Sequence, residues 1–205
     1  MKLNESQVIF NQEEHTYLLN GNLLSGVTSL LGRQLFPKKY DTIDEAILRK
    51  AAERGSLIHE TIELVDSLGV SSDMAEVQAY LDIKAKNELT THCNEYLVSD
   101  NEHIASSIDI VFDDCSLADI KTTSKLDKEY VSWQLSIYAY LFELQNPTLK
   151  ANKRFAIWLP KPQYGKPALV EVERILSDIV QLLIECDKRG EQFDYSNIKA
   201  HKYEY

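Results

Sequence analysis

The chain has few of the residues that mark several common protein classes. Its three cysteines, Cys93, Cys115 and Cys186, are widely spaced and form no CxxC pair, which argues against a disulfide framework, a zinc ribbon or a four-cysteine cluster. The start of the chain lacks the basic segment and long apolar run of a signal peptide. No apolar stretch reaches the length of a membrane span. We therefore expect one compact domain over residues 1–205 in a reducing cytoplasm.

Positive charge is also scarce. The chain carries 22 Lys and Arg against 32 Asp and Glu, for a net charge of −10. This balance argues against indiscriminate binding to nucleic acids, because affinity for phosphates depends mainly on protein cations. It does not exclude a nuclease, since metal-dependent sites are themselves built from carboxylates. A protein of this composition that acts on DNA needs a local positive field or a metal ion.

What is present is an alternation of helical and strand-like patterns. Apolar and polar residues alternate on both sides of Asn20-Gly21-Asn22, which predicts an N-terminal hairpin over residues 8–31. The long helical pattern that follows has apolar positions at Ile43, Ile47, Ala51, Ile58, Ile62 and Val65. The expected helices span 41–68, 73–90, 127–144 and 175–190, and the expected strands 95–99, 104–112, 117–123, 154–160 and 168–174. This order predicts an α/β fold, a mixed central sheet flanked by helices, with a core over about 43–190.

The tripeptide Asp-Ile-Lys occurs twice, at 82–84 and 119–121. The first copy lies in a helical pattern, where residues two apart point in different directions, and we interpret it as a solvated helix face. The second lies in a predicted strand, whose two-residue period puts Asp119 and Lys121 on one face and Ile120 on the other. A solvated strand edge and half of a metal site both fit this second copy.

The preceding strand, IASSIDIVF, places Asp109 between two isoleucines, where an exposed carboxylate is unusual. If residues 113–115 form a three-residue turn, Asp109 lies directly opposite Asp119. Like charges opposite each other destabilise a sheet unless something compensates, and a divalent cation together with Lys121 would do so. A slip of one residue would instead turn Asp109 to the other face.

Two predicted helices carry paired polar residues at i and i+4, hence on one helix face. His59 and Glu63 form one such pair, with Gly55 one turn before His59. Gln134 and Tyr138 form the other, on the helix that follows Lys121. Each pair also fits an ordinary helix surface or an amphipathic helix that packs its aromatic residues.

Taken together in this order, these residues resemble the RecB-like branch of the PD-(D/E)xK nuclease superfamily, in particular its phage-type exonucleases without an iron–sulfur cluster. The pattern there is GxxxH on a helix, then GxxD, [DE]xK and QxxxY. Here GSLIH supplies the first element, Asp109 the second, Asp119 and Lys121 the third, and Gln134 and Tyr138 the fourth. Ser106 stands where that family has the glycine of GxxD. The resemblance implies a restriction-endonuclease-like core.

The resemblance also implies a set of roles. One or two Mg²⁺ or Mn²⁺ ions would be held by His59, Asp109, Asp119 and the Ile120 carbonyl, with Lys121 as the catalytic amine. Gln134 and Tyr138 would orient the DNA backbone or Lys121. Glu63 would support the metal or be a plain surface residue. Lys125 and Lys128, near the start of the helix after the motif, are candidate DNA contacts.

The activity implied is a metal-dependent DNA exonuclease of phage recombination or bacterial end repair. Two alternatives remain open. One is a non-catalytic DNA-binding or scaffold subunit, associated with a single-strand annealing protein or a helicase. The other is a structure-specific or site-specific endonuclease. No membrane association is expected.

Overall fold

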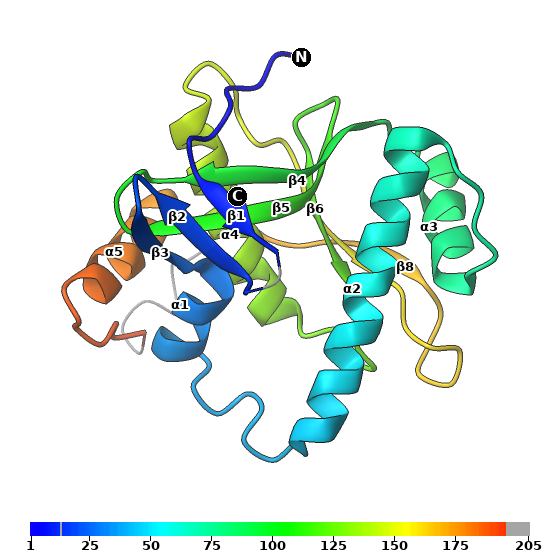
Figure 1. The fold of residues 1–205 in the computed structure, drawn as a ribbon, viewed down its shortest axis with the longest axis horizontal. Coiled ribbons are helices and arrows are strands. Elements are labelled where there is room, and N and C mark those ends of the chain that lie inside the picture. Colours follow the sequence, from blue (N-terminus) through cyan, green and yellow to red (C-terminus); the bar gives the residue numbers. More distant parts are fainter. Residues whose placement is uncertain (13, 196–205) are drawn as a thin grey trace.

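The computed structural model describes residues 1–12 and 14–195. Within them, eight strands form one mixed sheet flanked by five helices, so the predicted α/β class is confirmed (Figure 1). The strand order is β1-β2-β3-β5-β6-β7-β8, with β4 paired to β5 outside this path. The elements are β1 (Ile9–Asn11), β2 (Thr16–Leu19), β3 (Asn22–Gly26), α1 (Val27–Gln34), α2 (Glu45–Leu68), α3 (Ala75–Lys86), β4 (Thr91–Ser99), β5 (Ile104–Phe112), β6 (Leu117–Lys121), α4 (Lys128–Gln145), β7 (Arg154–Trp158), β8 (Ala168–Glu171) and α5 (Ser177–Lys188).

The predicted N-terminal hairpin is present as β2 and β3. Asn20 and Gly21 both have positive φ, at 50° and 81°, as a two-residue turn between antiparallel strands requires. Two details differ from the prediction. A short strand, β1, precedes the hairpin, and the last five predicted residues, 27–31, begin helix α1 instead of continuing a strand. Leu30 and Leu31 are fully buried there, because the helix packs its apolar side against the sheet and α4.

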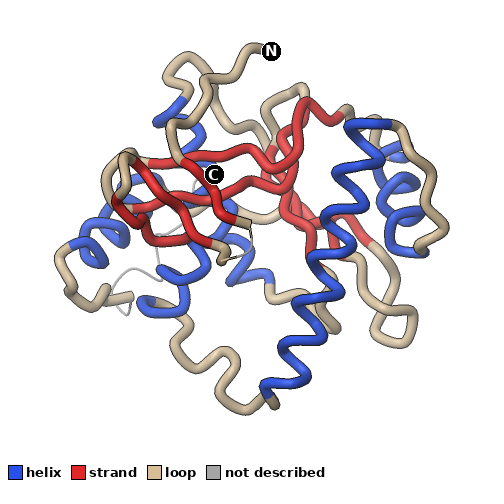
Figure 2. The backbone as a smooth tube through the Cα atoms, viewed as in Figure 1, coloured by secondary structure: helices blue, strands red, loops and turns tan. Residues whose placement is uncertain are grey.

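The sheet separates two hydrophobic layers (Figure 2). On one face, α1, α4 and α5 pack over residues such as Ile108 and Leu117. On the other, α2 and α3 pack over residues such as Ile110 and Ile120. Helix α4 is buried on most of its circumference, as expected of a helix that is largely apolar all round. No helix in the described part of the chain has the length and hydropathy to cross a membrane.

Strand β5 is paired to three other strands. β4 runs antiparallel along one edge of it from residue 105 to residue 112. The other edge is shared, with β3 parallel at 104–105 and β6 antiparallel at 110–111. Neither β3 nor β6 pairs with residues 106–109, so the sheet forks at this point. Ligands of open α/β sheets bind in crevices of this kind, where neighbouring strands diverge.

Helix α2 begins at Glu45, four residues later than predicted, and Asp44 caps it by accepting from the Ala46 amide at 2.8 Å. Its first half also departs from the prediction. Ile43 and Ile47 are 41% and 61% exposed, because this part of the chain extends beyond the sheet, as Figure 1 shows. The buried part of α2 is therefore the half that carries Ile58.

The interpretation of the first Asp-Ile-Lys as a solvated face is correct for Asp82 and wrong for Lys84. Asp82 is exposed. The Lys84 ammonium lies 2.6 Å from Asp66 Oδ1 in a buried network between α2, α3 and β4. Asp66 also accepts hydrogen bonds from Thr91 at 2.9 Å and from the Tyr80 hydroxyl. This carboxylate thus has a full set of donors.

Candidate metal centre

The turn between β5 and β6 determines which acidic residues face each other. The Phe112 amide donates to the Ser116 carbonyl at 2.9 Å across residues 113–115, and the register pairs Ile110 with Ala118. One further step brings Asp109 level with Asp119, as predicted. The paired ladder stops before that step, however. The Asp109 carboxylate instead accepts from the Ile120 amide at 2.6 Å and so lies inside the fork of the sheet.

Strand β6 divides its side chains as the two-residue period predicts. Ile120 is 3% exposed and packs in the core under α2 and α3. Asp119 is 1% exposed and its Oδ2 lies 2.7 Å from Lys121 Nζ. Burial acts to lower the pKa of Lys121, but the charges of the Asp119 and Asp109 carboxylates outweigh it, so this pKa is raised overall. Lys121 is therefore a positively charged amine held between two acids.

His59 projects from the buried half of α2 into the same fork. Its Nδ1 lies 3.5 Å from Asp109 Oδ2, and its Nε2 lies 3.2 Å from the Ile120 carbonyl oxygen. The imidazole thus contacts two of the predicted metal ligands at once. Gly55, one turn earlier, is not required by sterics, because a Cβ there would make an ordinary 3.6 Å contact with Thr122 Oγ1.

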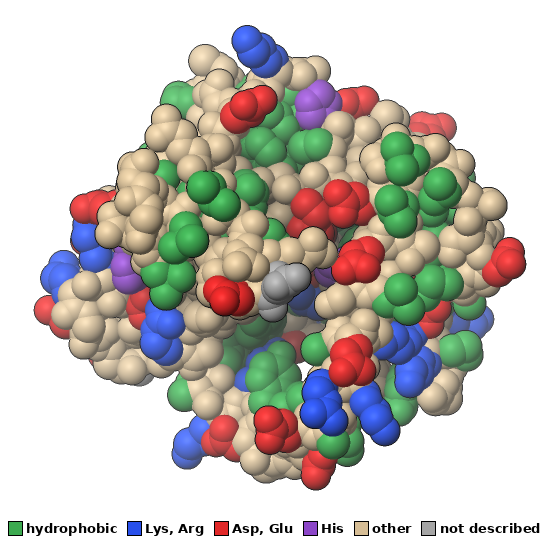
Figure 3. Space-filling view, in the orientation of Figure 1, with side chains coloured by type: hydrophobic (Ala, Val, Ile, Leu, Met, Phe, Trp, Pro, Cys, Tyr) green, Lys and Arg blue, Asp and Glu red, His purple; other side chains and the backbone are tan. Residues whose placement is uncertain are grey.

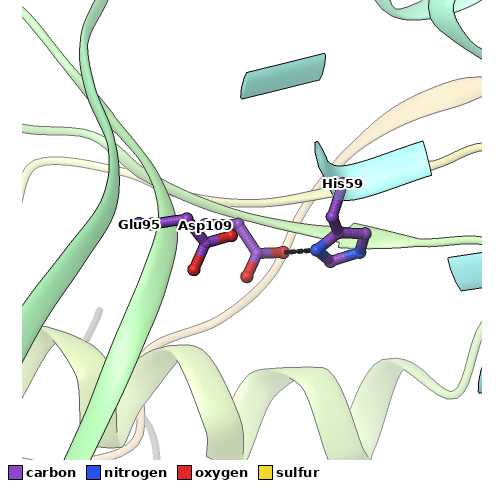
Figure 4. Close-up of side chains that lie close together, drawn as sticks. All are labelled: His59, Glu95 and Asp109. Carbon is purple, nitrogen blue, oxygen red and sulfur yellow. Dashed lines mark ion pairs between the residues drawn. The ribbon is translucent and has the colours of Figure 1, made fainter. Parts of the chain in front are cut away.

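Glu95 is a member of this cluster that the sequence analysis missed. Ligand atoms of His59, Glu95 and Asp109 all lie within 4.8 Å of one another (Figure 4). Glu95 lies on β4 between residues that pair with 108 and 110, hence across from Asp109. Its φ of 48° is uncommon for a residue with a side chain. The predicted strand 95–99 contains Glu95, but the sequence analysis set no register between that strand and 104–112, so the pairing with Asp109 was missed.

The cluster brings acidic groups close together in a partly buried site. Burial, and then the neighbouring Asp119 carboxylate, raise the pKa of Asp109 to about 8. Burial and Asp109 raise the pKa of Glu95 to about 7, and burial lowers the pKa of His59. Like charges and desolvation both disfavour ionised carboxylates, and a nearby cation reverses both effects. The two acids and the neutral imidazole therefore form a set of donors suited to a divalent cation.

Gln134 and Tyr138 approach the fork from α4, on the opposite face of the sheet from α2. Gln134 Nε2 donates to the Tyr138 hydroxyl at 2.8 Å, and Ser106 Oγ, at the position of the expected glycine, lies 3.4 Å from the same hydroxyl. Burial, and then the charges of Asp119 and Asp109, raise the pKa of Tyr138 well above its usual value. The pair is thus buried close to both aspartates.

The remaining predicted residues lie further out. Glu63 is exposed on α2 one turn after His59, near enough for its charge to contribute to the raised pKa of Glu95. Lys125 is exposed in the loop after β6, and Lys128 is exposed at the first residue of α4. The structure brings together seven predicted residues and one that was not predicted. They are His59, Asp109, Asp119, Ile120, Lys121, Gln134 and Tyr138, with Glu95.

Comparison with known proteins gives few matches. No family model matches the chain, and no curated protein is significantly similar to it. A solved structure described as "Crystal structure of SSO0001" is similar at 14% identity, over 81% of this chain and 75% of that one, with a TM-score of 0.47. The function of this chain therefore has to be inferred from its own residues.

Proposed function

We propose that this chain is a metal-dependent deoxyribonuclease of the RecB-like PD-(D/E)xK type that hydrolyses phosphodiester bonds from DNA ends. The observation that carries the proposal is the convergence in one fork of the sheet of His59, Asp109 and the Ile120 carbonyl, with the Asp119–Lys121 pair beside them. These residues come from α2, β5 and β6, so local sequence cannot account for their meeting. A phage recombination or bacterial end-repair enzyme of the cytoplasm fits this chemistry.

The donors of the candidate centre suit a hard divalent cation. Carboxylates of Asp109, Asp119 and Glu95, the Ile120 carbonyl and one imidazole supply oxygen ligands with a single nitrogen, a set that fits Mg²⁺ and Mn²⁺. One or two such ions, when bound, would polarise the scissile phosphate and lower the pKa of a coordinated water. Burial and the neighbouring carboxylates raise the pKa values of Asp109 and Glu95, so a cation placed among these groups would stabilise their charged forms.

Lys121 is the residue best placed to act on the reacting phosphate. The ion pair with Asp119 at 2.7 Å fixes the position of its ammonium, and a preorganised cation stabilises charge that develops on phosphoryl oxygens. It also positions an attacking water. Gln134 and Tyr138 hold the Asp119 side of the site from α4, with the two side chains fixed to each other at 2.8 Å.

The proposal is tested by incubating the purified protein with linear DNA in Mn²⁺, in Mg²⁺ and in EDTA. We expect degradation that needs the metal and that Lys121→Ala lowers strongly, while Lys86→Ala, at an exposed lysine of α3, retains it. Full activity of Lys121→Ala, or no cleavage under any metal condition, would overturn the nuclease assignment. The second outcome would favour a non-catalytic DNA-binding or scaffold subunit.

The form of the DNA separates end-dependent from internal cleavage. A closed circular duplex offers no end, so an exonuclease leaves it intact, whereas a structure-specific or site-specific endonuclease cuts it. The acidic surface, with its net charge of −10, favours a partner that supplies affinity for DNA. A single-strand annealing protein or a helicase would have that property.

A further inference from the structure

A cavity of about 400 Å³ lies between α1, the loop that follows it and the start of α4. Three aromatic rings line it, those of Phe36, Tyr40 and Tyr130, together with the hydroxyl side chains of Thr28 and Ser29. Figure 3 shows the surface hollowed beside α1 and the loop that follows it. The volume is within the range of sites that take small organic molecules.

One wall of the cavity is held rigidly. Lys39 Nζ lies 3.6 Å from the centre of the Tyr130 ring and 2.6 Å from Asp127 Oδ2, at the N-cap of α4. The rings of Phe36 and Tyr130 pack at 5.2 Å between centroids. Lys39 therefore ties the loop to α4 and covers Tyr130. Lys39 Nζ also lies 5.9 Å from the centre of the Tyr40 ring, but Tyr40 is 51% exposed, so its ring retains surface on which a planar group can stack.

The cavity adjoins the candidate metal centre. Tyr130, Gln134 and Tyr138 follow one another at four-residue intervals along one face of α4, so one helical turn of about 6 Å separates each from the next. Burial raises the pKa of Tyr40, and the charge of Lys121 opposes this rise in part. Burial also raises the pKa of Tyr130, and the charge of Asp119 adds to that rise. The rings thus lie within electrostatic reach of the residues proposed to act on the phosphate.

We infer that this cavity binds one unpaired nucleobase of the DNA strand whose phosphate lies at the metal centre, stacked on Tyr40. The inference rests on the proposed nuclease function and specifies its substrate as a strand with single-stranded or frayed bases. Every base has a flat face, so aromatic stacking holds single strands without regard to sequence. A base inside a duplex is paired and stacked, and it has to leave the helix before it can enter a pocket. A chain with net charge −10 also depends on such local contacts for affinity.

The test measures binding in EDTA, so that it is independent of cleavage. Fluorescence anisotropy compares an oligothymidylate of about 12 nucleotides, a length within known single-strand site sizes, with an abasic strand of equal length. We expect the wild-type protein to bind the thymidylate strand about tenfold or more tightly than the abasic strand, as one stacked base implies. We expect Tyr40→Ala to lose this difference and Tyr40→Phe, which keeps the ring, to retain it. Tyr164→Ala, an equally exposed tyrosine in the β7–β8 loop, is the control and should match the wild type.

Two results would overturn the inference. One is a wild-type protein that does not distinguish thymidylate from abasic strands, and the other is a Tyr40→Ala protein that distinguishes them as the wild type does. The failure of the nuclease proposal is a different result. Base-dependent binding without any Mn²⁺-dependent cleavage would retain the nucleobase pocket and remove the catalytic role.

Discussion

The tripeptide Asp-Ile-Lys occurs once in a helix, α3, and once in a strand, β6, and its side chains do different things in the two places. In α3, Asp82 is exposed while Lys84 turns into the core and pairs with Asp66 at 2.6 Å. In β6, the corresponding Asp119 and Lys121 lie on one face and pair with each other at 2.7 Å. The helical and strand periods separate one pair and unite the other. The same three residues therefore stabilise a helix packing in one place and form a candidate catalytic pair in the other.

The buried carboxylates near each copy differ in the same way. Asp66 is surrounded by donors, from Lys84, Thr91 and Tyr80. Asp109 faces Glu95 and Asp119, and its pKa is raised to about 8. A carboxylate with all its donors is typical of a structural role, whereas a strongly raised pKa among other acids is typical of a functional site, as proposed for Asp109.

The two lysines of these tripeptides, Lys121 and Lys84, should differ most in their effect on DNA cleavage. Lys121→Ala should lower Mn²⁺-dependent DNA cleavage by about 10²–10³-fold, because it removes a cation aimed at developing charge. Lys84→Ala should leave the rate of the folded protein unchanged. Initial rates on linear DNA at saturating Mn²⁺ compare the two, and equal losses in both variants would show that the β6 lysine has no special role.

For stability, in contrast to activity, Lys84 should be the lysine that matters. Lys84→Ala should cost about 3–5 kcal/mol in the free energy of unfolding, because it leaves Asp66 buried without its ionic partner. Lys86→Ala, an exposed residue on the same helix, should change stability by less than about 0.5 kcal/mol. Urea denaturation gives both values. A small effect at Lys84 would mean that the other donors to Asp66 suffice.

Metal affinity should separate two glutamates near His59. Glu95→Gln should weaken Mn²⁺ binding by about tenfold or more, because it removes one charge from the ligand set. Glu63→Gln, exposed on α2, should change the affinity much less. Isothermal titration calorimetry at fixed pH measures both, and a larger effect at Glu63 would assign the metal to the outer end of the cluster.

The smallest expected effect is on the pH dependence of the metal-free protein. Asp109 has a folded pKa of about 8, above its unfolded value near 3.9. The stability linked to this group is therefore complete below about pH 4 and is lost as the pH rises through about 8. Asp109→Asn has no proton to lose, so near pH 8.5 it should be more stable than the wild type by about 1 kcal/mol or more, or roughly 2–4 °C in melting temperature.

The control for this pH dependence is Asp82→Asn, at the exposed aspartate of the other tripeptide, which should follow the wild-type curve in EDTA. Saturating Mn²⁺ should reverse the order, since binding stabilises the wild type. A wild type that is the more stable protein at pH 8.5 without metal would contradict the raised pKa of Asp109.

Much of the fold, and part of the candidate site, could be predicted from local sequence patterns. The limits of β5 match the predicted 104–112, because a segment rich in apolar residues is bounded on both sides by polar turns. The register of Asp109 and Asp119 followed from the length of one turn. The contacts of His59 depend instead on how α2 crosses the sheet, which no spacing along the chain encodes. Their place in the site came from resemblance to a family.

What could not be predicted has physical reasons. Glu95 faces Asp109 through a left-handed backbone at a residue with a side chain, and its residue type does not signal such a conformation. Ile43 and Ile47 have helical apolar spacing but extend past the sheet, where nothing covers them. The start of α1 reads like the end of a strand because Val27, Leu30 and Leu31 suit either environment until the sheet that receives them is known.

The pairing of β5 with β3 determines what happens if the N-terminal residues are removed. The N-terminal strands cover one end of β5, through β3 at 104–105, and so close a row of backbone amides and carbonyls. Removal of residues 1–26 would open that row to other molecules, and an unpaired strand edge is a template for self-association. We therefore expect a protein shortened to residues 27–205 to self-associate more readily than the full chain.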